Sequence, residues 1–163
     1  MPQPEKMCMQ CEKRAYCDRV IYLNDEQFLT SMLHTVQMGQ TGIRSVMKNA
    51  VGSQLKTELK AQLKEYDALE KEALRLAASK GFELKDLNPA LETMSTMISK
   101  VQLMGGEVDS KIAGMLIQGN TRGMITGLKN AHQFNKQDEE VRLLSRKLID
   151  CETANIRQMQ GFL

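Results

Sequence analysis

Three cysteines near the start of the chain have the residue type and spacing that suit metal binding or thiol chemistry. They are Cys8, Cys11 and Cys17. Two residues separate the first pair, a spacing at which two thiolates can bind one tetrahedral ion. A complete zinc or iron site needs a fourth ligand, which Asp18 or a second subunit could supply. Three interpretations stay open: a zinc or iron site, a reversible disulfide between Cys8 and Cys11, and an arm with reduced thiols.

Length and composition predict one helical domain. The chain has 163 residues, no Trp and only 4% aromatic residues, whereas a sheet would be richer in aromatic and β-branched side chains. No apolar run reaches the roughly 20 residues needed to cross a bilayer, and the first residues lack the apolar segment of a signal peptide. We therefore expect a cytoplasmic protein that does not bind a membrane, with cysteines that are thiols or ligands rather than disulfides. The fourth cysteine, Cys151, is expected to pack as a small apolar residue.

Charge and motifs exclude several classes of function. The net charge is +2, and positive and negative residues are interspersed without a long basic run, so nucleic acid is not an expected partner. Acyl-transfer, phosphate-loop and nucleotide-binding motifs are absent from the sequence, which argues against an ordinary enzyme.

An internal repeat organises the chain. Residues 36–50 read VQMGQTGIRSVMKNA, and residues 117–131 read IQGNTRGMITGLKNA, at an offset of 81. The alignment pairs Gln37 with Gln118 and ends on a shared Lys-Asn-Ala triplet. A weaker match follows with an offset of 82. We interpret the chain as a duplicated helical hairpin.

Capping signals and apolar spacing predict the first hairpin. Asn24, followed by two acids and a glutamine, is typical of a helix start, and apolar residues then recur at steps of three and four up to Ala50. A second helix begins at Ser53, which is expected to cap it, and stops at Gly81. The short connection predicts that the two helices are antiparallel.

The rest of the chain predicts a short helix and a second hairpin. The short helix opens at Asn88-Pro89 and ends before Gly105-Gly106. A third long helix runs from about Asp109 to Phe134, and a fourth follows a turn that ends at Asp138. If the second and third long helices run the same way, the short helix is a crossover along the bundle.

Glycines recur inside the first and third predicted long helices. Each costs about 1 kcal/mol of helix propensity against Ala, so something is expected to approach them closely. One interpretation is tight packing between these two helices, and the other is the seam of a homodimer. Gly123→Leu should destabilise the monomer in the first case and split a dimer in the second. The five positions are Gly39, Gly42, Gly119, Gly123 and Gly127.

Two helical hairpins joined by a long crossover resemble the ferritin-like family, which includes ferritins, rubrerythrins and related di-iron carboxylate proteins. The resemblance covers Asp25 to about Gly161. It implies an all-α, up-down four-helix bundle over residues 24–163, with the crossover helix between the second and third long helices and residues 1–23 as a cysteine-containing arm. In that family the first helix of each hairpin supplies a Glu and the second supplies Glu-x-x-His.

Placed by the repeat, the metal positions of that family are only partly retained. Both single carboxylates are amides here, and Ala73 and Asn155 replace the two imidazoles. Two carboxylates and two amides suit a hard divalent ion better than a pair of redox-active irons. We expect no ferroxidase chemistry and favour a metal-free cluster in which burial and the mutual repulsion of the two carboxylates raise the pKa of at least one of them. The inherited positions are Gln37, Glu70, Gln118 and Glu152.

The function expected from these residues is non-enzymatic. The leading hypothesis is a structural or partner-binding module without cofactor, whose partner is a second copy or another protein. One alternative is the binding or storage of a divalent metal through Glu70 and Glu152. The other is a thiol-based redox accessory that uses Cys8, Cys11 and Cys17, with zinc or iron on these cysteines as a variant.

Overall fold

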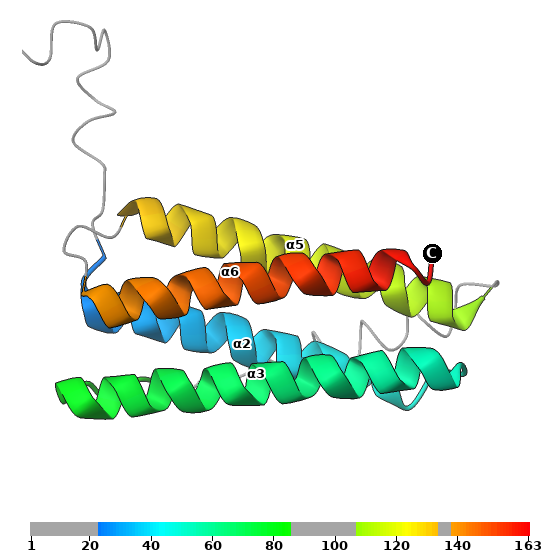
Figure 1. Ribbon diagram of the computed structural model, residues 1–163, viewed down its shortest axis with the longest axis horizontal. Coiled ribbons are helices and arrows are strands. Elements are labelled where there is room, and N and C mark those ends of the chain that lie inside the picture. The colour runs from blue at the N-terminus through cyan, green and yellow to red at the C-terminus, as the bar shows by residue number, and fades with distance from the viewer. Residues whose placement is uncertain (1–22, 86–106, 134–137) are drawn as a thin grey trace, which may run out of the picture.

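The structure, a computed structural model, describes residues 23–85, 107–133 and 138–163. Its elements there are four α-helices: α2 (Asp25–Met47), α3 (Ser53–Lys80), α5 (Val108–Gln133) and α6 (Glu139–Gln160). The helices lie side by side with their axes roughly aligned (Figure 1). The colours show that α2 and α3 run in opposite directions, as do α5 and α6. The prediction of an all-helical, four-helix fold is confirmed. The short helix expected after Asn88 and residues 1–22 of the arm lie outside the described residues.

Two of the predicted helix ends have the expected geometry. The Asn24 side chain accepts a hydrogen bond from the Gln27 N–H at 2.8 Å, and the Gln27 side chain accepts one from the Asn24 N–H at 3.1 Å. This reciprocal pair satisfies two backbone donors that the helix leaves free. At the end of α3, Gly81 has a φ of 72°, a left-handed conformation that glycine adopts without steric cost. The Phe82 N–H then donates to the Ala77 carbonyl at 2.9 Å.

The start of α3 differs from the prediction. Gly52, not Ser53, is the N-cap residue, and its position carries no side-chain cap. Instead, the Asp109 carboxylate of α5 accepts hydrogen bonds from the backbone N–H groups just before the helix, those of Val51 at 2.8 Å and Gly52 at 2.7 Å. The first turn of α5 is thereby attached to the connection between α2 and α3.

The core lies between all four helices. α5 packs against α6 and α2, and α3 packs against α2 and α6. Burial of a large aliphatic or aromatic side chain contributes about 1.5–3 kcal/mol, so the apolar stripes of the helices are the main source of stability. The largest fully buried apolar side chains are Phe28, Leu29, Leu33, Ile43, Leu55, Leu59, Ile112 and Met159.

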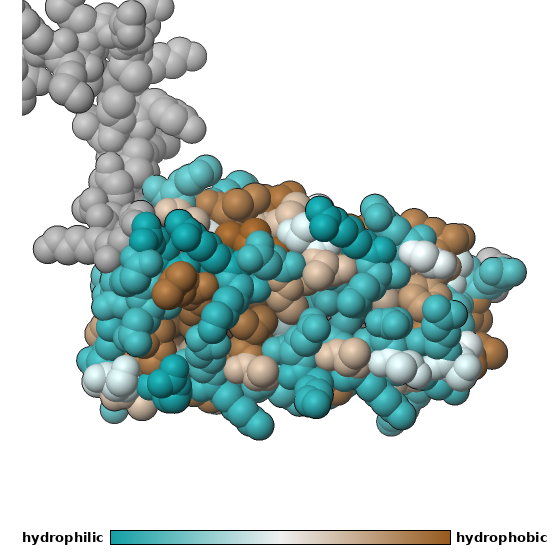
Figure 2. All heavy atoms as spheres, viewed as in Figure 1, coloured by the Kyte–Doolittle hydropathy of each residue, from teal (hydrophilic) through white to brown (hydrophobic). Residues whose placement is uncertain are grey.

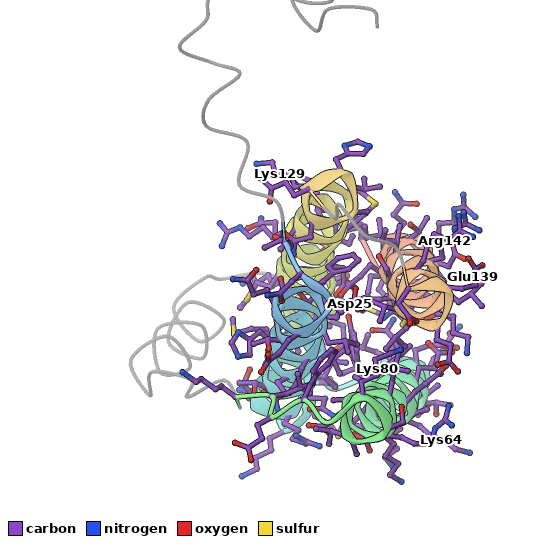
Figure 3. The ribbon with its side chains drawn as sticks, turned by 90° about the vertical axis from the view of Figure 1, so that its left-hand side faces the viewer. Asp25, Lys64, Lys80, Lys129, Glu139 and Arg142 are labelled. Carbon is purple, nitrogen blue, oxygen red and sulfur yellow. The ribbon has the colours of Figure 1, made fainter. Side chains whose placement is uncertain are left out.

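An ionic contact closes one end of the bundle. Lys80, at the end of α3, lies 2.5 Å from the carboxylate of Asp138, which caps the start of α6. The hydrogen bond between them raises the pKa of Lys80 and lowers that of Asp138. Asp25, in the first turn of α2, lies at the same end (Figure 3). Its pKa is raised, first by burial and then by the charge of Asp138.

Polar side chains cover much of the outer surface, with apolar patches between them (Figure 2). Within the described ranges, every helix is too short or too polar to span a membrane.

Three of the five singled-out glycines lie at contacts between helices. A Cβ built on Gly39 would lie 2.5 Å from Cζ of Tyr66 in α3, and one on Gly127 would lie 3.1 Å from Ile149 in α6. A Cβ on Gly123 would lie 2.7 Å from Oε1 of Glu152 in α6 and 3.1 Å from Thr35 in α2. The close approaches are therefore mainly within each hairpin rather than between α2 and α5.

The other two glycines, Gly42 and Gly119, have open space around them, since a Cβ there would meet no described atom within 4 Å. A homodimer seam through these two positions stays a prediction.

Replacing either glycine of α2 by alanine should change the free energy of unfolding, but in opposite directions. Gly42→Ala should raise the free energy of unfolding by up to about 1 kcal/mol, because Ala favours the helix and meets no neighbour. Gly39→Ala should lower it by about 1–3 kcal/mol, because the methyl group would overlap the rigid Tyr66 ring. Urea unfolding of both variants measures the difference. Equal stability of the two variants would contradict the close packing of Gly39.

Candidate functional site

A group of buried polar side chains lies at mid-length of α3, α5 and α6. We call it the central polar cluster and define it as Tyr66, Asn120, Glu152 and Asn155. All four are at least nine-tenths buried, with exposed fractions of 0%, 6%, 2% and 0%. Buried polar groups are costly unless they are hydrogen-bonded. This cluster is therefore the most chemically distinctive place in the described interior.

The Tyr66 hydroxyl is the hub of the central polar cluster. It donates to Oδ1 of Asn120 at 3.2 Å, and the neighbouring side chains of Glu152 and Asn155 influence its pKa. The ring fits because Gly39 of α2 has no side chain at the point of contact. Burial, followed by the charge of Glu152, raises the pKa of Tyr66 above its ordinary value. Tyr66 therefore stays a neutral phenol.

Glu152 is a carboxylic acid in the protein core. Burial raises its pKa to about 8, and the neighbouring Tyr66 hydroxyl offsets only part of that effect. Within the described residues, no second carboxylate contributes to this shift. The expected raised pKa is thus found, but its cause is desolvation alone. The carboxyl packs against the α5 backbone at Gly123 and is mainly protonated at neutral pH.

Glu70 belongs to a separate hydrogen-bonded group. Its Oε1 accepts from Nε2 of Gln37 at 3.0 Å, and its Oε2 accepts from Nε2 of Gln40 at 2.8 Å. The Gln40 amide also donates to Asp67 at 2.9 Å. The predicted contact between Gln37 and Glu70 is present, but the group holds α2 to α3 and does not include Glu152.

Gln118 does not join either group. Its side chain is exposed on α5, so the expected convergence of all four inherited positions is wrong. The inward residue of this turn is Asn120, two positions later. The sequence contained the signal, because Asn120 continues the inward spacing set by Ile112 and Leu116, whereas Gln118 was chosen from the repeat.

These side chains do not fit a di-iron centre. Such a centre needs carboxylates and imidazoles that converge on two metal ions. In the described parts of the chain, no group of three or more His, Cys, Asp or Glu side chains is arranged to hold a metal ion. Glu70 has amide donors on both oxygens, and Glu152 has neutral neighbours. We derive no step of oxygen chemistry from them.

The structure describes one of the four cysteine thiols, that of Cys151. Cys8, Cys11 and Cys17 lie outside the described residues, and their proposed roles stay predictions. Cys151 is half-buried beside Asn155, whose Nδ2 donates to its sulfur at 3.6 Å. Burial, followed by the charge of Glu65, raises the pKa of the Cys151 thiol to about 12. That thiol is therefore a weak nucleophile at neutral pH.

Glu152→Gln should flatten the dependence of stability on pH. The carboxyl has a pKa of about 8 when folded and an ordinary value of 4.5. Between these values the folded chain binds more protons than the unfolded chain. The free energy of unfolding therefore falls as pH rises, by up to about 1.4 kcal/mol per pH unit. Glutamine has no such proton to lose.

Urea unfolding at about pH 5, 6.5 and 8 measures this slope. Glu70→Gln is the matched control, because it removes a half-buried carboxylate and leaves Glu152 in place, so the slope should persist. A constant difference between wild type and Glu152→Gln across the pH range would contradict the assignment.

Comparison with known proteins supports the fold and goes no further. No protein-family model and no curated protein sequence matches the chain. The structure is similar to the crystal structure of a DUF305 fragment from Deinococcus radiodurans, with a TM-score of 0.65. The match covers 84% of this chain and 93% of that chain, at 12% sequence identity. At this identity the similarity shows a shared helical-bundle fold.

Proposed function

We propose that the chain is a divergent ferritin-like bundle that acts without catalysis, as a structural module that binds a protein partner. Its buried polar groups hold the helices together, and its outer surface makes the functional contact. The proposal includes a cytoplasmic location and excludes nucleic acid and membrane as partners, because charge is evenly distributed and no apolar run is long.

One observation carries the proposal: the carboxylates at the two proposed metal positions lie in separate places, and Glu70 already has an amide donor on each of its oxygens. Gln37 and Gln40 donate to the two oxygens of Glu70. Glu152 has a phenol beside it and lies against the α5 backbone. Amide and phenol donors stabilise carboxyl groups without a metal. The polar interior is therefore best explained by its contribution to the fold.

Two hydrogen-bonding contacts, one on each side of the segment, support the proposed crossover helix. The backbone oxygen of Lys85 lies 2.8 Å from Nε2 of His34 on α2, and Asp109 is bonded to Val51 just past the end of α2. These two contacts place the described ends of the segment beside the middle of α2 and just past its C-terminal end. A helix advances about 1.5 Å per residue, so a helix that begins at Asn88 and ends before Gly105 is long enough to cover that distance. We propose that this segment is the crossover of an up-down bundle.

The outer surface of α5 offers a place for the partner. Ile125 and Leu128 lie about one turn apart and are 44% and 42% exposed. Exposed apolar side chains on one face of a helix are a common basis of helix–helix association. We take a second copy of the chain as the partner.

Metal analysis tests the absence of a di-iron centre. Protein purified without chelators should contain iron far below one ion per chain, because neither carboxylate group offers the ligands that iron requires. Elemental analysis by mass spectrometry gives the content. Two irons per chain, lost in the variant Glu70→Ala plus Glu152→Ala, would overturn the proposal.

Solution mass tests the partner surface. Wild-type protein should form a dimer that dissociates when Ile125→Asp and Leu128→Asp are combined, because the charges would be buried at the contact. Leu74→Asp is the matched control, since Leu74 is 43% exposed on α3 and lies away from the proposed surface. Sedimentation equilibrium measures the mass, and thermal unfolding verifies that each variant is folded. A wild-type monomer over the whole concentration range would contradict a second copy as partner.

A further inference from the structure

Several buried polar atoms in the described interior have no hydrogen-bond partner. Three belong to the central polar cluster: Nδ2 of Asn120, Oε2 of Glu152 and Oδ1 of Asn155. A fourth is Oε1 of Gln62, one turn before Tyr66 on the same helix. Unpaired polar atoms at such depth reduce stability, and in native proteins they usually face a bound water or ion. The cluster therefore has the character of a site for a small ligand.

Three of these side chains lie around the Tyr66 hydroxyl. That hydroxyl donates to Asn120 of α5, and its pKa is influenced by Glu152 and Asn155 of α6, so polar side chains of three helices meet there. Gln62 uses its amide nitrogen to donate to Gln158 of α6 at 2.9 Å, which leaves its oxygen unpaired. Buried polar atoms without partners therefore occur on three helices, at Tyr66 and within one turn of it on α3.

The chemistry of these atoms favours a cation. The amide of Asn120 can turn about its terminal bond, so that its nitrogen donates to the Tyr66 oxygen. The Tyr66 hydrogen can then be donated to Glu152. This arrangement leaves an amide oxygen of Asn120, the amide oxygen of Asn155 and a carboxylate oxygen of Glu152 free to act as ligands. Hard oxygen ligands of this kind bind cations such as Na⁺, Mg²⁺ and Ca²⁺.

The charge balance selects a monovalent ion. Glu152 is the one carboxylate of the cluster, and its other members are neutral amides and a phenol. A monovalent cation would neutralise it, whereas a divalent cation would leave a net positive charge in the core, which is costly. We propose that the central polar cluster binds one monovalent cation of the sodium type through Glu152, Asn155 and Asn120. This site goes beyond the proposed partner-binding role and does not depend on it.

Thermal unfolding in sodium chloride and in choline chloride at equal ionic strength tests the site. The buffer is held at about pH 9, above the pKa of about 8 of Glu152, so that the carboxylate is available. Above the dissociation constant, the unfolding temperature of wild type should rise by about 3–5 °C for each tenfold increase in sodium. Choline, which is too large for the cluster, should have no such effect.

Three variants locate the effect. Glu152→Gln, which keeps the shape of the side chain and removes its charge, should abolish the rise, and Asn155→Ala should reduce it. Glu70→Gln should retain the full rise, because Glu70 belongs to the separate group with Gln37 and Gln40. Line broadening of the sodium-23 NMR signal gives a second reading, which wild type should show and Glu152→Gln should lack.

Several results would overturn the proposal. Equal unfolding temperatures of wild type in sodium and choline, without line broadening, would mean that water or nothing fills the cluster. A sodium effect that persists in Glu152→Gln would place the ion elsewhere. A larger stabilisation by Mg²⁺ or Ca²⁺ than by Na⁺ at the same concentration, lost in Glu152→Gln, would refute the monovalent assignment.

Discussion

The burial of one carboxyl group in the core constrains how the four helices pack. Glu152 can leave water only as a neutral acid or with a counterion, and its neighbours suit both states. The Tyr66 hydroxyl approaches it from α3, and the backbone of α5 approaches closely because residue 123 is a glycine. The ring of Tyr66 in turn requires a glycine at position 39 of α2. The polar contacts of Tyr66 and the two glycine contacts therefore link all four helices around Glu152.

The surroundings of the two carboxyl groups differ from those in a di-iron centre. Di-iron proteins bring several carboxylates and imidazoles to one place, and the metal charge compensates their repulsion. Here the carboxyl groups at the inherited positions are kept apart: Glu70 is bonded by Gln37 and Gln40, and Glu152 is enclosed by neutral groups. Each group then needs only hydrogen-bond donors or one weakly bound cation. We propose that these interior groups act in stability and in proton or ion binding, and that partner binding belongs to the outer surface.

The sequence predicted the elements of the fold better than the members of the site. Capping residues such as Asn24 and Gly81 act locally, so the helix ends that they define could be located without the structure. The contact at the start of α3 could not be located in this way, because the backbone N–H groups of Val51 and Gly52 donate to Asp109, which comes from another helix. The repeat correctly indicated Glu152 as a buried acid but misplaced its neighbours, since Gln118 is exposed and Tyr66 comes from the other hairpin. Contacts between hairpins depend on helix rotation, which a linear pattern does not specify.

Direct titration of the Glu152 carboxyl group tests this account most closely. Carbon-13 NMR of protein labelled at the glutamate side chains, with Glu152→Gln used to assign the signal, follows the protonation of that one group. The account predicts a carboxyl signal that titrates near pH 8, well separated from the other glutamates. A Glu152 signal that titrates together with them, near the ordinary value of 4.5, would show that the group is solvated, and the central polar cluster would lose its physical basis.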